Sequence, residues 1–238
     1  MAYLSIVIPA YNEARRITGT LDKIHDLLKT KDYYCEVILV DDGSTDNTVD
    51  VAEKSRLAKE GHLKIVKNPA NKGKGFSVKN GILNSAGEYV LLSDADLSTS
   101  IEEIDRLFSL MKDGYDIVIG SRAVKGATVS VRQPWYREAM GKAFNFFVRL
   151  LVIKGFSDTQ CGFKLFKGNA AREIALLMKI DGFCFDVEML YLAKKKRYNI
   201  LETGVIWKNS PESKVKLMSS PFSMFLDLFS IKKIHKDR

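Results

Sequence analysis

Short, almost wholly apolar runs alternate with segments of helical periodicity in the first half of the chain, and this restricts the fold more than any other feature. The runs predict strands rich in Val, Ile and Leu over residues 4–8, 36–40, 63–66, 88–92 and 116–119. Strands of this composition are buried on both faces. Apolar side chains at helical spacing separate them, as between Ile17 and Leu28, behind a predicted N-cap at Asn12. This order predicts an α/β fold with a mostly parallel central sheet and helices on both faces.

The second half carries fewer strand patterns. Its periodicity predicts helices over residues 134–153, 170–178 and 187–193, a strand over 200–207 and an apolar, aromatic segment over 220–234. The sequence contains no internal repeat and no low-complexity linker. We therefore expect the 238 residues to form a single domain.

The positive charge of the chain is concentrated in two segments. The net charge is +8, and residues 132–155 carry five basic residues against one acidic residue, while residues 208–238 carry seven against three. Such segments indicate an anionic partner, for which nucleic acid, a phospholipid surface and a phosphorylated substrate all qualify. An ordinary solvated basic face is the alternative.

Cysteine content and hydropathy limit the class of protein. Three cysteines without a Cys-x-x-Cys pair argue against a disulfide framework or a zinc site and fit a reducing compartment. The sequence predicts no signal peptide, because the first residues show no basic region, no long apolar region and no small-residue cleavage site. It predicts no transmembrane helix, because it contains no window of about 18 apolar residues. We therefore expect a cytoplasmic protein.

Polar segments follow four of the predicted strands, at the edge where open α/β sheets bind their ligands. These segments are residues 9–13, 41–46, 93–98 and 120–122. In an extended segment Asp94 and Asp96 point the same way, and two carboxylates can hold Mg²⁺ or Mn²⁺. Such a cation stabilises the charge on a departing diphosphate. Asp-x-Asp alone is common in helix N-caps and turns. The metal hypothesis therefore rests on its combination with the polar segments at the other three strand ends.

Other nucleotide-binding and catalytic motifs are absent from the sequence. It contains no Gly-x-Gly-x-x-Gly after the first strand and no P-loop, which argues against a dinucleotide-binding domain and a P-loop NTPase. No Gly-x-Ser-x-Gly motif occurs, and none of the three histidines stands beside a candidate nucleophile. Residues 72–75, Lys-Gly-Lys-Gly, offer backbone amides and lysines to a phosphate, although a plain turn would look the same.

Several motifs together resemble the family 2 glycosyltransferases of the GT-A fold. In the first half they are Ile6-Val-Ile-Pro-Ala-Tyr-Asn-Glu13, Val40-Asp-Asp-Gly-Ser-Thr-Asp46, Asn71-Lys-Gly-Lys-Gly75 and Asp94-Ala-Asp-Leu-Ser98. In the second half they are Asp158-Thr-Gln-Cys-Gly-Phe-Lys-Leu-Phe166 and Phe185-Asp-Val-Glu188. The second-half motifs are similar to those of dolichyl-phosphate β-glucosyltransferases and, more loosely, of dolichyl-phosphate mannose synthases.

The resemblance implies a role for each matching position. Residues 1–122 would bind the nucleotide sugar, and residues 123–238, with a basic amphipathic helix and tail, would bind the acceptor. Asp96, together with Asp94, would ligate the metal. Arg122 and Arg132 would bind the donor diphosphate and the acceptor phosphate, and Asp158 would act near the attack as a base or a positioning group. The nucleotide sugar would be bound by Pro9, Tyr11, Glu13, Asp41, Lys74, Asp94 and Lys214.

The resemblance implies an inverting, metal-dependent hexosyltransferase that moves glucose from UDP-glucose to a dolichyl or other polyprenyl phosphate. A phosphate acceptor is already anionic, so arginines can align it without a strong general base. Mannose transfer from GDP-mannose, and transfer to a saccharide or other soluble hydroxyl acceptor, are the alternatives; a hydroxyl acceptor would need a base.

The two basic segments admit more than one partner. The basic helix and tail would allow peripheral contact with the cytoplasmic face of a membrane, and packing against the sheet or a second subunit is the alternative. A nucleic-acid-binding module is disfavoured because it leaves the acidic strand ends without a role. The sequence leaves the oligomeric state open.

Overall fold

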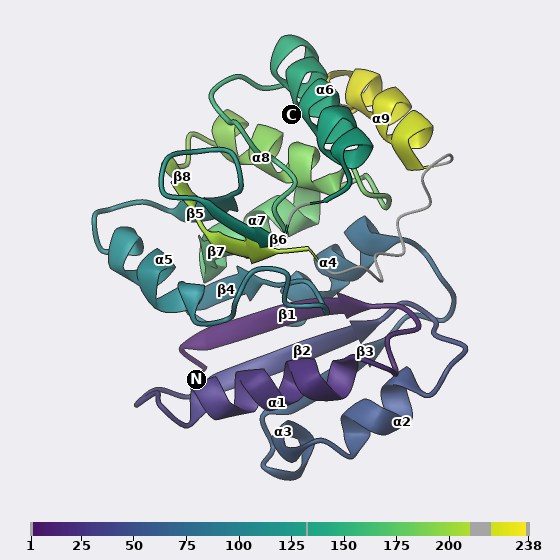
Figure 1. Ribbon diagram of the computed structural model, residues 1–238, viewed down its shortest axis with the longest axis vertical. Coiled ribbons are helices and arrows are strands. Elements are labelled where there is room, and N and C mark those ends of the chain that lie inside the picture. The colour runs from purple at the N-terminus through teal and green to yellow at the C-terminus, as the bar shows by residue number, and fades with distance from the viewer. Residues whose placement is uncertain (1, 132, 210–219, 237–238) are drawn as a thin grey trace.

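A seven-stranded sheet forms the centre of the protein, whose computed structural model describes residues 2–131, 133–209 and 220–236 (Figure 1). The strand order is β3-β2-β1-β4-β7-β5-β8, and β7 alone among these strands runs antiparallel to its neighbours. A second sheet pairs β6 with β9 in parallel. The strands are β1 (Leu4–Ala10), β2 (Cys35–Asp41), β3 (Leu63–Lys67), β4 (Tyr89–Leu92), β5 (Ile117–Ser121), β6 (Thr128–Val131), β7 (Lys164–Lys167), β8 (Ile200–Gly204) and β9 (Ile206–Lys208).

Helices cover both faces of the large sheet, as the alternation of apolar runs predicts. One face packs against α4 (Lys74–Leu83), α7 (Gly168–Leu177) and α8 (Phe185–Lys195). The other face packs against α1 (Ile17–Leu28), α2 (Thr48–Glu53), α3 (Arg56–Lys59) and α5 (Glu103–Met111). The two remaining helices, α6 (Trp135–Leu151) and α9 (Ser220–Ile234), lie side by side at the end of the molecule away from β1, β2 and β3 (Figure 1).

The alternation of side chains along a strand explains the two cores. In β1, Val7 belongs to the core under α4, whereas Ile6 and Ile8 belong to the core under α1. Since successive residues of a strand point to opposite faces, a strand that is apolar at every position is stable only between two layers of helices. The α/β expectation is confirmed.

Three details differ from the sequence-based expectations. Asn12 is not a helix N-cap: its φ is 55°, its Oδ1 accepts the amide of Thr45, and α1 begins only at Ile17. The predicted strand over residues 200–207 is two strands in two sheets, since β8 pairs with β5 and β9 pairs with β6. Strands β6 and β7 were not predicted. Lys164 and Lys167 at the ends of β7 hide its apolar character, although Lys164 is fully buried.

Gly81 on α4 allows this helix to approach the sheet closely. A Cβ at residue 81 would lie 2.8 Å from Cγ2 of Val40 and closer still to Cγ1 of Val7. We expect Gly81→Ala to lower the free energy of unfolding by about 1–3 kcal/mol, because overpacking outweighs the better helix propensity of alanine.

Gly19 provides the matched control for this substitution. It lies on the exposed side of α1, and a Cβ there meets no atom within 4 Å. Gly19→Ala should raise the free energy of unfolding by about 0.5–1 kcal/mol through helix propensity alone. Urea denaturation of both variants measures the two signs, and a stabilised Gly81→Ala protein would contradict the packing argument.

Candidate active site

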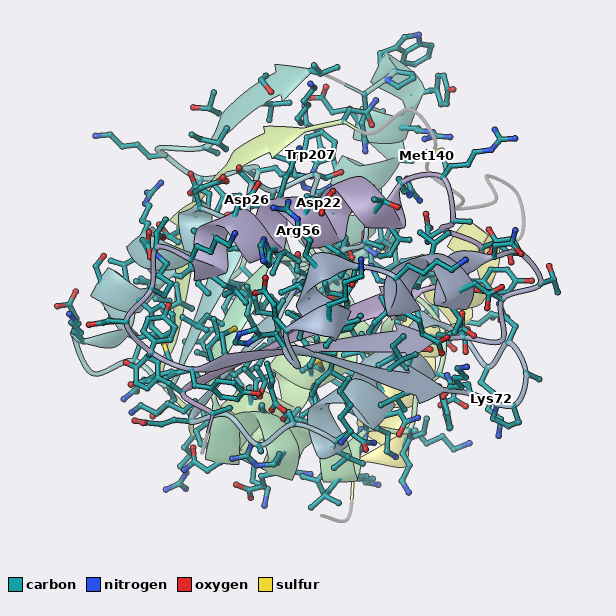
Figure 2. The ribbon with its side chains drawn as sticks, turned by 90° about the horizontal axis from the view of Figure 1, so that it is seen from below. Asp22, Asp26, Arg56, Lys72, Met140 and Trp207 are labelled. Atoms are coloured by element: carbon teal, nitrogen blue, oxygen red, sulfur yellow. The ribbon has the colours of Figure 1, made fainter. Side chains whose placement is uncertain are left out.

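An open pocket of about 290 Å³ lies where the carboxyl ends of β4 and β5 meet α6, α9 and β9. Its charged lining residues are Lys74, Asp94, Asp96, Arg122, Arg137 and Asp186. Trp207 of β9 and Met140 of α6 also line it, and Figure 2 shows both side chains on the β6 and β9 side of the molecule. This is the edge at which the sequence predicts a ligand site.

The structure brings four of the predicted site residues together in this pocket: Lys74, Asp94, Asp96 and Arg122. The other described candidates for nucleotide binding are Pro9, Tyr11, Glu13 and Asp41. They lie at the carboxyl ends of the neighbouring strands β1 and β2, where Ala10 pairs with Asp41. Pro9 is half-buried and Tyr11 is exposed. Arg132 and Lys214 lie outside the described residues.

The carboxylates of Glu13 and Asp41 are engaged in local contacts. Arg16 Nη2 donates to Glu13 Oε1 at 2.6 Å, and Arg16 Nη1 lies 3.9 Å from Asp96 Oδ2. Arg16 therefore stands between Glu13 and the pocket. Asp41 is buried, and its Oδ2 accepts the backbone amide of Ser44 at 3.2 Å, which fixes the turn after β2.

Asp94 is held in place by an ion pair and by the absence of a side chain at residue 162. Lys74 Nζ lies 2.7 Å from Asp94 Oδ1. Burial raises the pKa of the Asp94 carboxyl, but the nearby cations Lys74, Lys164 and Arg122 together outweigh this and hold that pKa below its usual range. A Cβ at Gly162 would overlap the Asp94 carboxylate. Glycine at 162 is therefore what lets the loop before β7 close against Asp94.

The carboxylates of the pocket suit a cation that is shared with a substrate. Asp96 Oδ1 accepts the Ser98 amide at 2.9 Å, and its side chain remains 17% exposed at the pocket wall. Within residues 2–131, 133–209 and 220–236, no group of three or more His, Cys, Asp or Glu could hold a metal ion. Mg²⁺ is often bound by one or two carboxylates, with phosphate oxygens and water completing the shell. The segment is not extended as expected, because residues 95–96 form a turn in which the Leu97 amide donates to the Asp94 carbonyl at 3.2 Å. Both carboxylates nevertheless line the pocket, so Asp96 and Asp94 fit that arrangement.

Arg122 is held by a buried carboxylate. Its Nε and Nη2 donate to the two oxygens of Asp158 at 2.7 and 2.8 Å, and its backbone amide donates to Oδ2 at 3.0 Å. The amide of Gln160 also donates to Asp158, at 3.2 Å. Burial raises the pKa of Asp158, but Arg122 and the more distant Lys164 together outweigh this and hold that pKa below its usual range. A carboxylate with four donors and a lowered pKa is a weak base.

The loop that carries Asp158 is fixed from two sides. Glu202 of β8 accepts the amides of Ser157 and Asp158, at 2.9 and 2.8 Å. Asn145 of α6 accepts the hydroxyl of Thr159 at 3.0 Å. The guanidinium of Arg122 also lies 5.4 Å from the ring centre of Trp207. The position of Arg122 therefore depends on β8, β9 and α6 together.

Asp186 is a pocket residue that the sequence indicates only as part of a family motif, without a role in the site. It lines the pocket, and the fully buried Lys164 donates both to it and, at 2.6 Å, to the carbonyl of Cys161. Burial raises the pKa of Asp186 above its usual value, despite the nearby ammonium of Lys164. The available sequence pattern was the pair of acidic residues, Asp186 and Glu188, in the first turn of a helix.

Glu188, in contrast, orders the second half of the chain. It is fully buried and accepts the amides of Lys179 and Ile180, at 2.8 and 3.0 Å. His235, just beyond α9, lies 2.7 Å from Glu188 Oε1. One carboxylate therefore joins α8, the loop before it and the end of α9.

Comparisons with known proteins agree with this architecture. The family model described as glycosyl transferase family 2 matches residues 5–174. The chain is 37% identical to the dolichyl-phosphate β-glucosyltransferase of Dictyostelium discoideum, over 97% of this chain and 74% of that protein. It is 35% identical to the protein of the same name from Saccharomyces cerevisiae, again over 97% of this chain and 74% of that protein.

A solved structure shows the same fold. The crystal structure of glucosyl-3-phosphoglycerate synthase from Mycobacterium tuberculosis, in complex with Mn²⁺, UDP and glucosyl-3-phosphoglycerate, superimposes with a TM-score of 0.65. The match covers 96% of this chain and 80% of that chain, at 18% identity. At this identity the likeness concerns the GT-A fold alone. From the family model and the two relatives, the chain belongs to glycosyl transferase family 2.

Proposed function

We propose that the protein transfers glucose from UDP-glucose to a dolichyl or other polyprenyl phosphate, with inversion at the anomeric carbon. The relatives named as dolichyl-phosphate β-glucosyltransferases support the donor sugar and the acceptor. The observation that carries the proposal is the form of the pocket: the acidic pair Asp94 and Asp96 lines it together with the buried-carboxylate clamp on Arg122. A diphosphate with its cation fits the former, and an anionic acceptor fits the latter.

The donor would lie across the ends of β1, β2 and β4. In this proposal Pro9, Tyr11, Glu13 and Asp41 hold the base and ribose, and Asp94 contacts the ribose or sugar. The ammonium of Lys74, whose pKa the Asp94 carboxylate raises to about 12 although burial opposes this, stays charged beside the phosphates. Lys214 would close over the phosphates. A divalent cation bound by Asp96, with Asp94, would supply Lewis-acid stabilisation of the departing diphosphate.

The acceptor phosphate would be aligned by Arg122, with Arg132 as its partner. A guanidinium held by a carboxylate keeps its orientation before the substrate arrives, so little reorganisation is needed in the transition state. In this proposal Asp158 positions Arg122 and does not accept a proton. The phosphate oxygen then attacks the anomeric carbon from the face opposite the diphosphate, and the carbon–oxygen bond to UDP breaks.

Asp186 supports a second candidate, transfer to a hydroxyl acceptor. A carboxylate in a pocket with a raised pKa has the property required of a general base. We expect Asp186→Asn to retain most transfer to a polyprenyl phosphate, because that acceptor needs no base. If Asp186→Asn instead lowers the kcat of glucose transfer at least a hundredfold, without a change in the apparent affinity for the phosphate acceptor, the base mechanism is favoured.

A lipid acceptor would place the reaction at a membrane surface, and we propose peripheral contact with its cytoplasmic face. Among the described helices none is long and apolar enough to cross a membrane.

Donor choice and metal use can be measured by thermal shift. UDP-glucose should raise the Tm more than GDP-mannose, and Mn²⁺ should increase the shift, because ligands that bind the native state stabilise it by mass action. Asp96→Ala should lose the Mn²⁺-dependent part of the shift, while the exposed Asp113→Ala serves as the matched control. Equal shifts for all sugars, or an unchanged Mn²⁺ response in Asp96→Ala, would count against the proposal.

Asp158→Asn tests the positioning role through both activity and stability. We expect a higher KM for the phosphate acceptor, and a free energy of unfolding about 2–3 kcal/mol lower at pH 7. This lies below the usual cost of breaking a buried pair, because the Arg122 side chain is 29% exposed.

The pH dependence of this stability loss has a definite sign. Because the pKa of Asp158 is lowered in the folded state, its stabilisation is present above the unfolded carboxyl pKa, about 3.9, and is lost as pH falls further. The difference between the native protein and Asp158→Asn should therefore shrink in urea titrations below about pH 4. A difference that is constant with pH would argue against the ion pair as its source.

A further inference from the structure

Helix α6 carries a continuous apolar stripe that the described part of the protein leaves uncovered. Trp135, Ala139, Ala143, Phe146 and Leu150 follow one another at intervals of three or four residues, so they lie along one side of the helix. All five are exposed, with 81% exposure for Trp135 and 62% for Leu150. The one buried residue of this 17-residue helix, Val148, lies on the opposite side.

The exposed apolar side chains continue from α6 to α9. The ring of Phe146 contacts Phe147, that of Phe147 contacts Phe225 of α9, and that of Phe225 contacts Phe229, with centroid distances of 5.7, 5.2 and 5.1 Å. Phe229 and its neighbour Leu226 are again exposed. These contacts make one surface, which we call the α6–α9 face, of the stripe on α6 together with Phe147, Phe225, Phe229 and Leu226.

Basic side chains accompany the α6–α9 face. Lys142 and Arg149 are exposed and each follows a stripe residue by three positions, which places them along its edge. Lys142 is paired with Glu138 at 2.7 Å, so the charge at this edge comes chiefly from Arg149 and from the net excess of basic residues. Residues 135–154 carry four basic residues and one acidic residue, and residues 220–236 carry three and one. Long basic side chains can lie over an apolar surface with their charges at its margin. A face of this kind matches a layer of apolar chains beneath anionic head groups.

The α6–α9 face adjoins the active-site pocket. Arg137, Met140 and Gly141 of α6 and Met224 of α9 line the pocket, so the same two helices form its wall and carry the exposed stripe. Figure 1 shows both helices together at one end of the molecule. A lipid whose phosphate entered the pocket could keep its hydrocarbon chain beside these helices.

From this juxtaposition we infer that the α6–α9 face docks on a membrane that contains anionic phospholipids, so that the pocket opens at the level of the head groups. The role of docking in catalysis rests on the proposed lipid acceptor; the docking itself rests on the surface. A second copy of the chain is a poorer occupant. In a two-fold dimer the same patch meets itself, which would bring two basic faces together.

Vesicle flotation of the full chain tests the inference, with phosphatidylcholine vesicles that contain or lack about a third of phosphatidylglycerol. We expect the protein to bind the anionic vesicles at least ten times more tightly than the neutral ones, and less tightly as NaCl rises. Leu150→Glu should weaken this binding at least tenfold, because it places a negative charge in the stripe.

Leu176→Glu is the matched control, because Leu176 lies on α7, outside the α6–α9 face, and is 64% exposed. It should bind the anionic vesicles as the native protein does. Since both leucines are exposed, the Tm of each variant should stay close to that of the native chain. Both variants should also keep the thermal shift with UDP-glucose and glucose transfer to a short, water-soluble polyprenyl phosphate.

The failure of docking can be told apart from the failure of the proposed function. Equal vesicle binding by Leu150→Glu, Leu176→Glu and the native chain would overturn docking through this face, whatever the enzyme assay gives. So would a dimer in light scattering that Leu150→Glu dissociates while vesicles do not bind. If UDP-glucose does not raise the Tm of the native chain, that result would count instead against the proposed function.

Discussion

The reversed direction of β7 is the constraint on which the site depends. In a parallel sheet the segments that follow the strands meet at the carboxyl edge, but an antiparallel strand brings the segment that precedes it to that edge. Residues 158–163 therefore reach the ends of β4 and β5 before the chain enters β7. From there Asp158 clamps Arg122, and Gly162 closes against Asp94. One strand reversal thus joins the two halves of the chain at the pocket.

Charge pairing is the second constraint at the pocket. Lys74 pairs with Asp94, Lys164 with Asp186, and Arg122 with Asp158. Partly buried charges are costly without such partners, so the pairs are needed for the protein to hold this many ionic groups in one place. The pKa of Asp94 and Asp158 is lowered because their cations outweigh burial, whereas burial prevails at Asp186 and raises its pKa. The same kind of pair thus yields carboxylates of different chemistry.

Much of the fold follows from local sequence patterns, while the site follows from them only in part. The apolar runs predicted the strands of the first half because a strand that is buried on both faces is apolar at nearly every position, and such a run is easy to recognise. The carboxyl-edge rule then placed Asp94, Asp96 and Arg122 together, and the family resemblance added Lys74. It could not identify β7, because the buried Lys164 is paired with a residue 22 positions away, and such pairing has no local sequence pattern. The place of Asp186 in the pocket was missed for the same reason.

Helix α6 also has a consequence for how its residues can be studied. Most stability of a protein helix comes from packing its apolar face, yet α6 buries Val148 alone among its residues. Substitutions along Trp135, Phe146 and Leu150 therefore leave the folded core almost unchanged. A selection for folding or expression would leave these positions free to vary. If only certain residues are accepted at these positions, the restriction must come from an interaction of α6 with something other than the rest of the folded chain.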